Sequence, residues 1–326
     1  MLLACSGTAP PCPVAEPRAA EALAGTVWLD LLDPTEEERA LVERATGLRV
    51  PSTAEIHEIE TSSRLRVEGE ALYLSTPLSL RLDGDSRVSS VGFVLSSTHL
   101  ITLRFAKFPA FETYEAHPWG KTPPSSMAVF IGLLEAIVDR LADVLESVGH
   151  ELDDLSRRIF HADKETGPGP RKISNDARLR ATLRGIGRTG DLISNVRDSL
   201  LGIMRIATYV SDMAASWMPP GLPARFKTLR QDLTSLSDYD VQLTNKVQFL
   251  LDATLGFINI EQNNGIKVLT VVSLIGIPPT LIASIYGMNF KIMPELNWDW
   301  GYPYALTLIA ISILVPLLWA RRRGWL

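Results

Sequence analysis

The spacing of hydrophobic and polar positions changes character along the chain, and it first predicts strands. Apolar and polar residues alternate in short runs such as RLRVEGEALYLSTPLSLRL and HLITLRF, which is typical of half-buried strands. One helix is expected among these strands, with Asp33 as its N-cap and Pro34 as its first residue, because glutamates follow at the positive end of the helix dipole. The pattern predicts an α/β domain over 26–122, after an irregular, proline-rich stretch at 1–25.

Beyond residue 122, apolar residues recur at helical spacing. The pattern predicts a helical hairpin over 123–223, and then a helix that nothing interrupts from Ala224 until Pro278. At 1.5 Å per residue this last helix would be about 80 Å long. It begins amphipathic and ends wholly apolar, so we expect it to form a stalk over 224–265 and then to enter a membrane. The predicted fold class is α+β, with a cytoplasmic α/β domain, a long helical stalk and two C-terminal transmembrane helices.

Two apolar segments near the C-terminus are each long enough to cross about 30 Å of hydrocarbon. We expect transmembrane helices over 266–289 and 302–320, joined by an extracellular loop at 290–301 and followed by a basic tail at 321–326. Buried core helices are the alternative. The arginines of the tail and the aromatic rings of the loop favour a lipid bilayer, because basic residues mark the cytoplasmic side of a span and aromatic residues gather at its interfaces. With no signal-peptide pattern at the start, both termini are expected on the cytoplasmic side of the inner (plasma) membrane.

Eight positions recur every seven residues in and just before the first of these segments, and five of them carry a side-chain oxygen. Two sets offset by three residues share this period, and they are Asn263, Thr270, Ile277 and Ser284, and Ile266, Ser273, Thr280 and Gly287. These are the two seam positions of a helical bundle, and polar groups in a membrane face the bundle interior or water. Because two helices cannot enclose a water path, several copies would have to surround a common axis. The alternative is that the hydroxyl groups bond only to their own helix backbone.

This polar stripe carries no carboxylate, and this limits the kind of cation that it could conduct. Neutral hydroxyl and amide groups cannot replace the hydration of a divalent cation, and Mg²⁺ gives up its water reluctantly. They can accept hydrogen bonds from water held on the ion. We therefore expect a cation that keeps much of its water shell, rather than a bare Zn²⁺ ion, which prefers His, Cys or carboxylate ligands. Ile266, Leu269 and Ile277 are candidates for apolar constrictions that close by dewetting.

Composition and charge narrow the classes of function. A net charge of −5 over 326 residues gives no general attraction to nucleic acid. Cys5 and Cys12 have no metal-ligand partners at the required spacing, no phosphate-binding G-x-x-x-x-G-K-[ST] motif is present, and the five histidines are scattered. A membrane-anchored enzyme is an alternative, although no nucleophile arrangement is visible and no organic cofactor is expected. Seven acidic residues between Glu135 and Asp154 would either gather cytosolic cations or form a solvated face.

The stretch YGMNF at 286–290, followed by MPEL, an aromatic loop and a basic tail, strongly resembles the CorA family of magnesium transport channels. GFINIEQN and PPTLIASIYGMNF are similar to the enterobacterial branch. The resemblance implies a funnel-shaped homopentamer whose first membrane helix lines the pore while the second packs around it. It implies a selectivity filter at Gly287, Met288 and Asn289, where the asparagine ring would hold an incoming hydrated Mg²⁺. The pore-facing positions that it implies are Asn263, Ile266, Thr270, Ser273, Ile277 and Thr280.

The resemblance also implies that cytosolic Mg²⁺ closes the channel by bridging acidic residues between subunits. Asp252 on the stalk matches one such position, and Asp83 or Asp85 in the LDGD turn is its candidate partner. Ordinary surface carboxylates are the alternative for these residues.

One departure from the family pattern lies in the extracellular loop. Lys291 stands where the family often carries an acidic residue, which leaves Glu295 and Asp299 as the acidic residues of the loop. The predicted function is passive, potential-driven uptake of hydrated Mg²⁺, with Co²⁺ and Ni²⁺ as further cargo. A zinc transporter of the related ZntB group, driven by protons, is the alternative, although YGMNF and MPEL argue against it.

Overall fold

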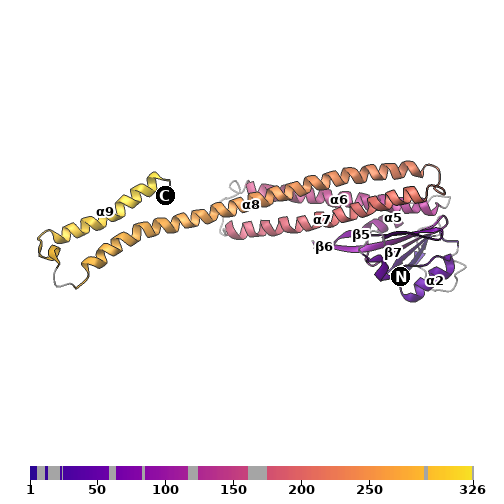
Figure 1. The fold of residues 1–326 in the computed structure, drawn as a ribbon, viewed down its shortest axis with the longest axis horizontal. Helices are drawn as coiled ribbons and strands as arrows, with labels where there is room; N and C mark the ends of the chain where they lie inside the picture. The colour runs from indigo at the N-terminus through magenta and orange to yellow at the C-terminus, as the bar shows by residue number, and fades with distance from the viewer. Residues whose placement is uncertain are drawn as a thin grey trace. The chain divides into compact units, whose positions relative to one another are not determined.

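The chain folds into two compact units, Met1–Leu251 and Asp252–Leu326. Figure 1 shows their helices and strands, and one helix, α8 (Leu222–Tyr286), begins in the first unit and ends in the second. The computed structural model describes residues 1–5, 12–13, 23, 25–58, 64–82, 85–116, 124–160, 175–289 and 293–324.

A seven-stranded mixed sheet forms part of the first unit, with the strand order β2-β1-β3-β7-β6-β5-β4. Strands β3 and β7 run parallel, and the other neighbouring strands in the described part of the sheet are antiparallel. Strands β5 and β6 form a long antiparallel hairpin. Their residues pair in register from Leu72 with Leu95 to Leu82 with Asp85. The strands are β1 Leu2–Cys5, β2 Cys12–Pro13, β3 Trp28–Leu32, β4 Leu65–Glu68, β5 Ala71–Leu82, β6 Asp85–Leu95 and β7 Leu100–Arg104.

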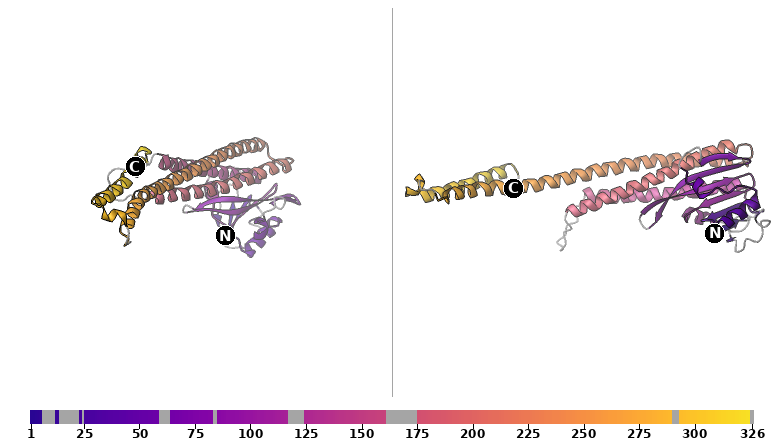
Figure 2. Two further views of the ribbon diagram at one scale, coloured as in Figure 1. Left: turned by 60° about the vertical axis from the view of Figure 1, so that its left-hand side comes forward. Right: turned by 60° about the horizontal axis from the view of Figure 1, so that its bottom comes forward.

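Helices cover both faces of this sheet, as the two views of Figure 2 show. On one face, α2 and α3 close an apolar core around Leu29, Ile101 and Leu103. On the other face, Phe93 of β6 meets Phe130 of α6 edge to face, with 5.4 Å between the ring centroids. The helices of this unit other than α8 are α2 Glu36–Thr46, α3 Thr53–Ile56, α5 Pro109–Glu115, α6 Ser126–Phe160 and α7 Asn175–Met213.

Helix α2 begins later than the sequence pattern predicted. Its N-cap is Thr35, whose hydroxyl accepts from the backbone N–H of Glu38 while the Glu38 carboxylate accepts from the backbone N–H of Thr35. The prediction of Asp33 as the N-cap is therefore wrong. The backbone N–H of Asp33 donates to Arg104 O at 2.8 Å, so this residue still follows the pairing of β3 with β7.

Part of the N-terminal stretch that was predicted to be irregular forms strands. Leu2–Cys5 forms strand β1, which pairs antiparallel with β3 and with the short β2. Leu2 and Leu3 are buried there. The expectation of an irregular stretch fails for these residues because a strand of four residues is too short to display a period, while an open edge of β3 offers it backbone partners.

Helices α6, α7 and the N-terminal part of α8 pack side by side in the first unit. Lys246 of α8 donates to Asp153 of α6 at 2.7 Å, and Arg225 of α8 pairs with Glu135 of α6. α8 therefore runs parallel to α6, while the hairpin connection makes α7 antiparallel to both.

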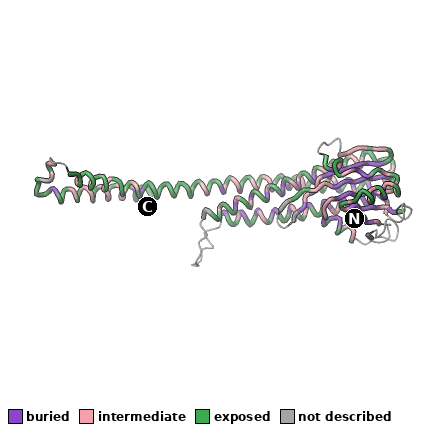
Figure 3. Tube along the Cα trace, turned by 90° about the horizontal axis from the view of Figure 1, so that it is seen from below, coloured by how far each residue is buried: buried purple, intermediate pink, exposed green. Residues whose placement is uncertain are grey.

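The second unit consists of the remainder of α8, a short 3-10 helix η2 (Pro294–Asn297) and α9 (Gly301–Arg322). Both α8 and α9 contain a stretch long and apolar enough to cross a membrane. Large apolar side chains are exposed there, including Leu269, Ile277 and Leu318, and Figure 3 marks most of these two segments as exposed. Such continuous apolar surface is stable in lipid rather than in water.

Candidate functional site

The predicted polar stripe lies on one uninterrupted helix. Seven of its eight positions, from Asn263 to Ser284, fall within α8, and the eighth, Gly287, follows directly after its end. Because a helix makes 3.6 residues per turn, positions that recur at three and four residues share one face. Asn263, Thr270 and Thr280 are exposed in the single chain. Their side chains are therefore open to contacts outside the chain.

The hydroxyl hydrogens of two stripe residues are used within the helix. Thr270 Oγ1 donates to Ile266 O at 2.8 Å, and Thr280 Oγ1 donates to Gly276 O at 2.7 Å. This is the self-bonding that the sequence left open as an alternative, and it leaves the oxygen lone pairs outside the helix. Each hydroxyl therefore offers an acceptor to its surroundings, and an acceptor is what the outward-pointing hydrogens of a cation's water shell require.

Two adjacent prolines lie within the membrane-length part of α8. The helix continues through Pro278 and Pro279 to Tyr286. Because proline has no backbone N–H, the carbonyl groups of Leu274 and Ile275 lose their usual helical donors. The predicted transmembrane helix over 266–289 already contained both prolines, and the continuation of α8 through them keeps the stripe in register up to Ser284.

The G-M-N motif forms the C-terminal end of α8. The backbone N–H of Gly287 donates to Ala283 O at 3.0 Å and that of Met288 donates to Ile285 O at 3.3 Å, so these two residues close the last turn. Asn289 comes directly after this turn and is exposed. The C-terminal end of a helix carries about half a negative charge, because its last carbonyl groups have no helical donors. The motif thus combines an amide side chain with a helix end that attracts cations.

The acidic residues of the predicted loop lie beside the start of α9. Glu295 is half-buried in η2, and its carbonyl oxygen accepts from the backbone N–H of Trp298 at 3.4 Å. Trp298 packs against Tyr304 with 5.6 Å between the ring centroids, while Asp299 is exposed. Lys291 lies outside the described residues. The turn is therefore built from aromatic packing, with Asp299 open to solvent.

The structure does not test the pairing of the predicted regulatory residues. Asp252 is exposed on α8 and is the first residue of the second unit. Asp83 lies outside the described residues, and Asp85 begins β6 with its side chain also outside them. Across the described ranges, no three His, Cys, Asp or Glu side chains gather as metal ligands. The pairing of Asp252 with either aspartate stays a prediction.

Comparison with known proteins decides the family. A family profile described as CorA-like Mg²⁺ transporter protein matches residues 24–322. The chain belongs to this family. The magnesium transport protein CorA of Haemophilus ducreyi is 33% identical over 303 residues, covering 92% of each chain. That of Escherichia coli (strain K12) is 32% identical over 315 residues, covering 95% of each chain.

The CorA-like fold is also found among solved structures. The complete structure of the CorA magnesium transporter from Methanocaldococcus jannaschii matches with a TM-score of 0.73 at 20% identity, covering 100% of this chain and 99% of that chain. At that identity the likeness speaks for the fold alone. Together, the comparisons confirm the CorA resemblance, its enterobacterial character and the predicted α+β fold class.

The acidic run of α6 in this CorA-like chain is largely ion-paired. Glu135 pairs with Arg225, Asp143 with Arg140, Asp153 with Lys246 and Asp154 with Arg157. Burial, and then the neighbouring carboxylates, raise the pKa of Asp139, which lines an open cavity of about 340 Å³. These contacts favour a solvated, paired face over a cation collector.

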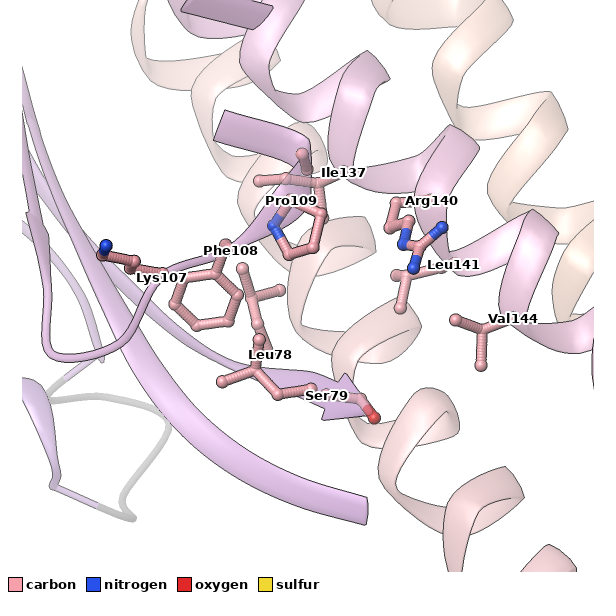
Figure 4. Close-up of a pocket in the computed structure, with 11 residues that line it drawn as sticks. Leu78, Ser79, Lys107, Phe108, Pro109, Ile137, Arg140, Leu141 and Val144 are labelled. Carbon is pink, nitrogen blue, oxygen red and sulfur yellow. The ribbon is translucent and has the colours of Figure 1, made fainter. Parts of the chain in front are cut away.

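A smaller cavity of about 80 Å³ lies nearby and is mainly apolar (Figure 4). Leu78, Phe108 and Ile137 form much of its wall, and Lys107 and Arg140 also line it. No candidate site residue of the sequence analysis lines it.

Proposed function

We propose that the chain is one subunit of a passive channel through which the membrane potential drives hydrated Mg²⁺ into the cell. The observation that carries this proposal is the G-M-N motif directly after Tyr286, at the end of a membrane-length helix with a polar stripe, in a chain of the CorA-like Mg²⁺ transporter family. The relatives from Haemophilus ducreyi and Escherichia coli are both named magnesium transport proteins.

The chemistry at the mouth of this channel is the capture of an ion together with its water. Asn289 would place an amide oxygen beside the carbonyl end of α8, where the partial negative charge attracts a cation. Deeper in the channel, Thr270, Thr280 and their neighbours on the stripe accept hydrogen bonds from the water shell. Co²⁺ and Ni²⁺ are further candidate cargo because they are hydrated ions with the same charge as Mg²⁺.

The conducting form is a homopentamer. A single chain offers two membrane-length helices in its described part, and these cannot surround a path by themselves. Five copies arranged around one axis would bring five polar stripes together, with α9 outside them in the lipid bilayer. Both termini and the first unit lie in the cytoplasm, and Glu295 and Asp299 lie on the outer side of the inner membrane. This is a transport role and not an enzymatic one, and it needs no organic cofactor.

The membrane potential is sufficient to drive such uptake. Moving one elementary charge through 100 mV is worth about 2.3 kcal/mol, so a divalent cation gains about 4.6 kcal/mol. Regulation by cytosolic Mg²⁺ would oppose this inward flux. Asp252, with Asp83 or Asp85 of a neighbouring copy, is the candidate site for that ion.

Reconstituted protein tests the proposal directly. Liposomes containing a Mg²⁺ indicator are given an inside-negative potential, and uptake is compared for the wild type, Asn289→Ala and Asn297→Ala. We expect Asn289→Ala to abolish Mg²⁺ uptake without changing the size of the assembly, because the filter loses its amide. Asn297→Ala is the matched control, since Asn297 is an exposed asparagine in η2. Normal Mg²⁺ uptake by Asn289→Ala, or uptake of Zn²⁺ that depends on a proton gradient, would contradict the proposal.

A further inference from the structure

The two membrane-length helices of the second unit meet near the C-terminal end of α9. Val271 of α8 is 5% exposed and Ala320 of α9 is 0% exposed, although most of the surrounding positions on both helices are exposed. In its described part, the second unit contains only one other helix, η2, which comes just before the start of α9. The end of α9 lies beside α8 in Figure 1 and in both views of Figure 2. Val271 and Ala320 therefore mark the level at which α9 packs against α8.

On one side of this crossing, each contact face carries a basic residue. Lys267 lies four residues before Val271 on α8. Arg323 lies three residues after Ala320, and it still follows the helix because its backbone N–H donates to Trp319 O at 3.1 Å. Positions three or four apart share one face of a helix, so both cations lie on the faces through which α8 and α9 meet. At 1.5 Å per residue, they lie about 6 Å and about 4.5 Å from the crossing along the helix axes, on the same side because the helices run in opposite directions.

The sequence offers these two cations no nearby carboxylate. There is no aspartate or glutamate over 262–294 or over 300–326. The nearest acidic residue on α8 is Glu261, between one and two turns before Lys267. Two further arginines at the same end of α9 add positive charge. Because like charges on facing helices repel each other, this end of the helix pair favours an anion that comes from outside the chain.

The cations also adjoin apolar surface. Val268 and Val272 of α8 and Leu318 of α9 are exposed. Trp319 is exposed too, and the guanidinium group of Arg323 lies over its ring, 5.4 Å from the centroid. Tryptophan rings gather where hydrocarbon meets the headgroups of a bilayer. A soluble anion would satisfy only the cations, whereas an anionic phospholipid offers them a phosphate and offers acyl chains to the apolar side chains.

We propose that Lys267 and Arg323 together bind the phosphate of an anionic phospholipid from the cytoplasmic leaflet, where α8 and α9 meet. The phosphate accepts hydrogen bonds from the ammonium group of Lys267 and the guanidinium group of Arg323, while the acyl chains lie along Val268 and Leu318. The bound lipid holds α9 against the helix that carries the polar stripe. This inference rests on the membrane placement of both helices in the proposed function, but not on the conduction of Mg²⁺.

Lipid binding to the purified full-length protein tests this inference. Native mass spectrometry counts the bound lipids while dioleoylphosphatidylglycerol or dioleoylphosphatidylcholine is titrated into the protein in detergent. We expect the wild type to bind phosphatidylglycerol more tightly than phosphatidylcholine, which carries no net charge. Lys267→Gln and Arg323→Gln should each weaken phosphatidylglycerol binding about fivefold, since one basic residue near an anionic lipid surface is worth about 1 kcal/mol. Arg323→Lys keeps the charge and should retain most of the binding.

Arg322→Gln is the matched control. Arg322 is exposed at the same end of α9, but it lies two residues after Ala320 and therefore on the opposite side of the helix from the contact with α8. Its replacement removes the same charge at the same depth and should leave phosphatidylglycerol binding nearly unchanged. Equal losses in Arg322→Gln and Arg323→Gln would overturn the inference, because the arginines would then act only through their total charge. Equal binding of the two lipids by the wild type would overturn it as well.

Two further measurements separate a lipid from a soluble anion, and lipid binding from transport. Inorganic phosphate at millimolar concentration should not displace bound phosphatidylglycerol, and displacement would mean that the site takes a soluble anion instead. Phosphatidylglycerol should raise the temperature at which the wild-type assembly dissociates, and it should raise that of Lys267→Gln by less; an equal rise in both would contradict the proposed site. If the wild type carries no Mg²⁺ into liposomes, the proposed function fails by itself, while the lipid measurements still decide this inference.

Discussion

Replacing Thr280 by valine tests the polar stripe with little disturbance of the helix. Thr280 Oγ1 donates to Gly276 O at 2.7 Å, but the same carbonyl group keeps its place in the helical bonding pattern when the hydroxyl is removed. Valine has nearly the same shape as threonine, so the protein should fold and assemble normally. The variant thus removes one outward acceptor from each copy and little else.

The expected effect on conduction follows from the number of acceptors that an ion's water meets. One accepted hydrogen bond is worth about 1 kcal/mol net. If the water shell engages two hydroxyls of the Thr280 ring at a time, the barrier rises by about 2 kcal/mol, which slows Mg²⁺ flux roughly thirtyfold. The assay is Mg²⁺ uptake into liposomes at a fixed potential, with equal amounts of assembled protein.

Thr307→Val supplies the control for this prediction. Thr307 of α9 makes the same type of bond, with Oγ1 donating to Pro303 O at 2.8 Å, but it lies on the second membrane-length helix. Its replacement should leave Mg²⁺ flux unchanged. Wild-type flux in Thr280→Val, or an equal loss in both variants, would refute the assignment of the stripe to the pore.

Three further predictions concern the first unit. Arg104→Met should lower the free energy of unfolding by about 3–5 kcal/mol in a urea titration, because it leaves Asp30 as an unpaired carboxylate that is 1% exposed; an unchanged midpoint would contradict this. Burial opposes ionisation of Glu55, but bonds from Ser52 and Arg49 outweigh it and lower the pKa of Glu55 to about 2. The stability from ionised Glu55 is therefore present above its ordinary pKa and is lost as pH falls toward about 2, so the difference in Tm between wild type and Glu55→Gln should shrink over that range rather than stay constant. Gly149→Ala should destabilise the fold by about 1–3 kcal/mol through its contact with the Tyr239 hydroxyl, and Tyr239→Phe should restore part of that loss; no restoration would mean that the contact is not the cause.

The sequence revealed the elements whose pattern is long and repetitive. The change from amphipathic to apolar character predicted a single long helix, and the structure contains it as α8. The two seven-residue recurrences, one containing Thr270 and the other Thr280, likewise needed only the helical period. Hydrophobic periodicity of this kind can be recognised in a sequence because many residues of one element contribute to the same repeating pattern.

Features that depend on distant partners were not readable in this way. The pairing of β1 with β3 joins residues about 25 positions apart, and Leu2–Cys5 is too short to show a period. Asp33 was predicted as the N-cap in place of Thr35, because the sequence does not show that the backbone N–H of Asp33 donates to Arg104 O, far along the chain. The ion pair between Arg197 of α7 and Asp240 of α8 was missed for the same reason: 43 residues separate its members, and neither lies in a motif.

The direction of two hydrogen bonds in α8 has a consequence for anions. Thr270 and Thr280 commit their hydrogens to carbonyl groups of the helix, so neither hydroxyl can donate to a passing chloride ion. An anion needs donors from its surroundings to replace lost water, and at these two positions of the proposed pore it would meet oxygen lone pairs instead. A lining of this kind discriminates between charges of opposite sign without carrying any charge itself.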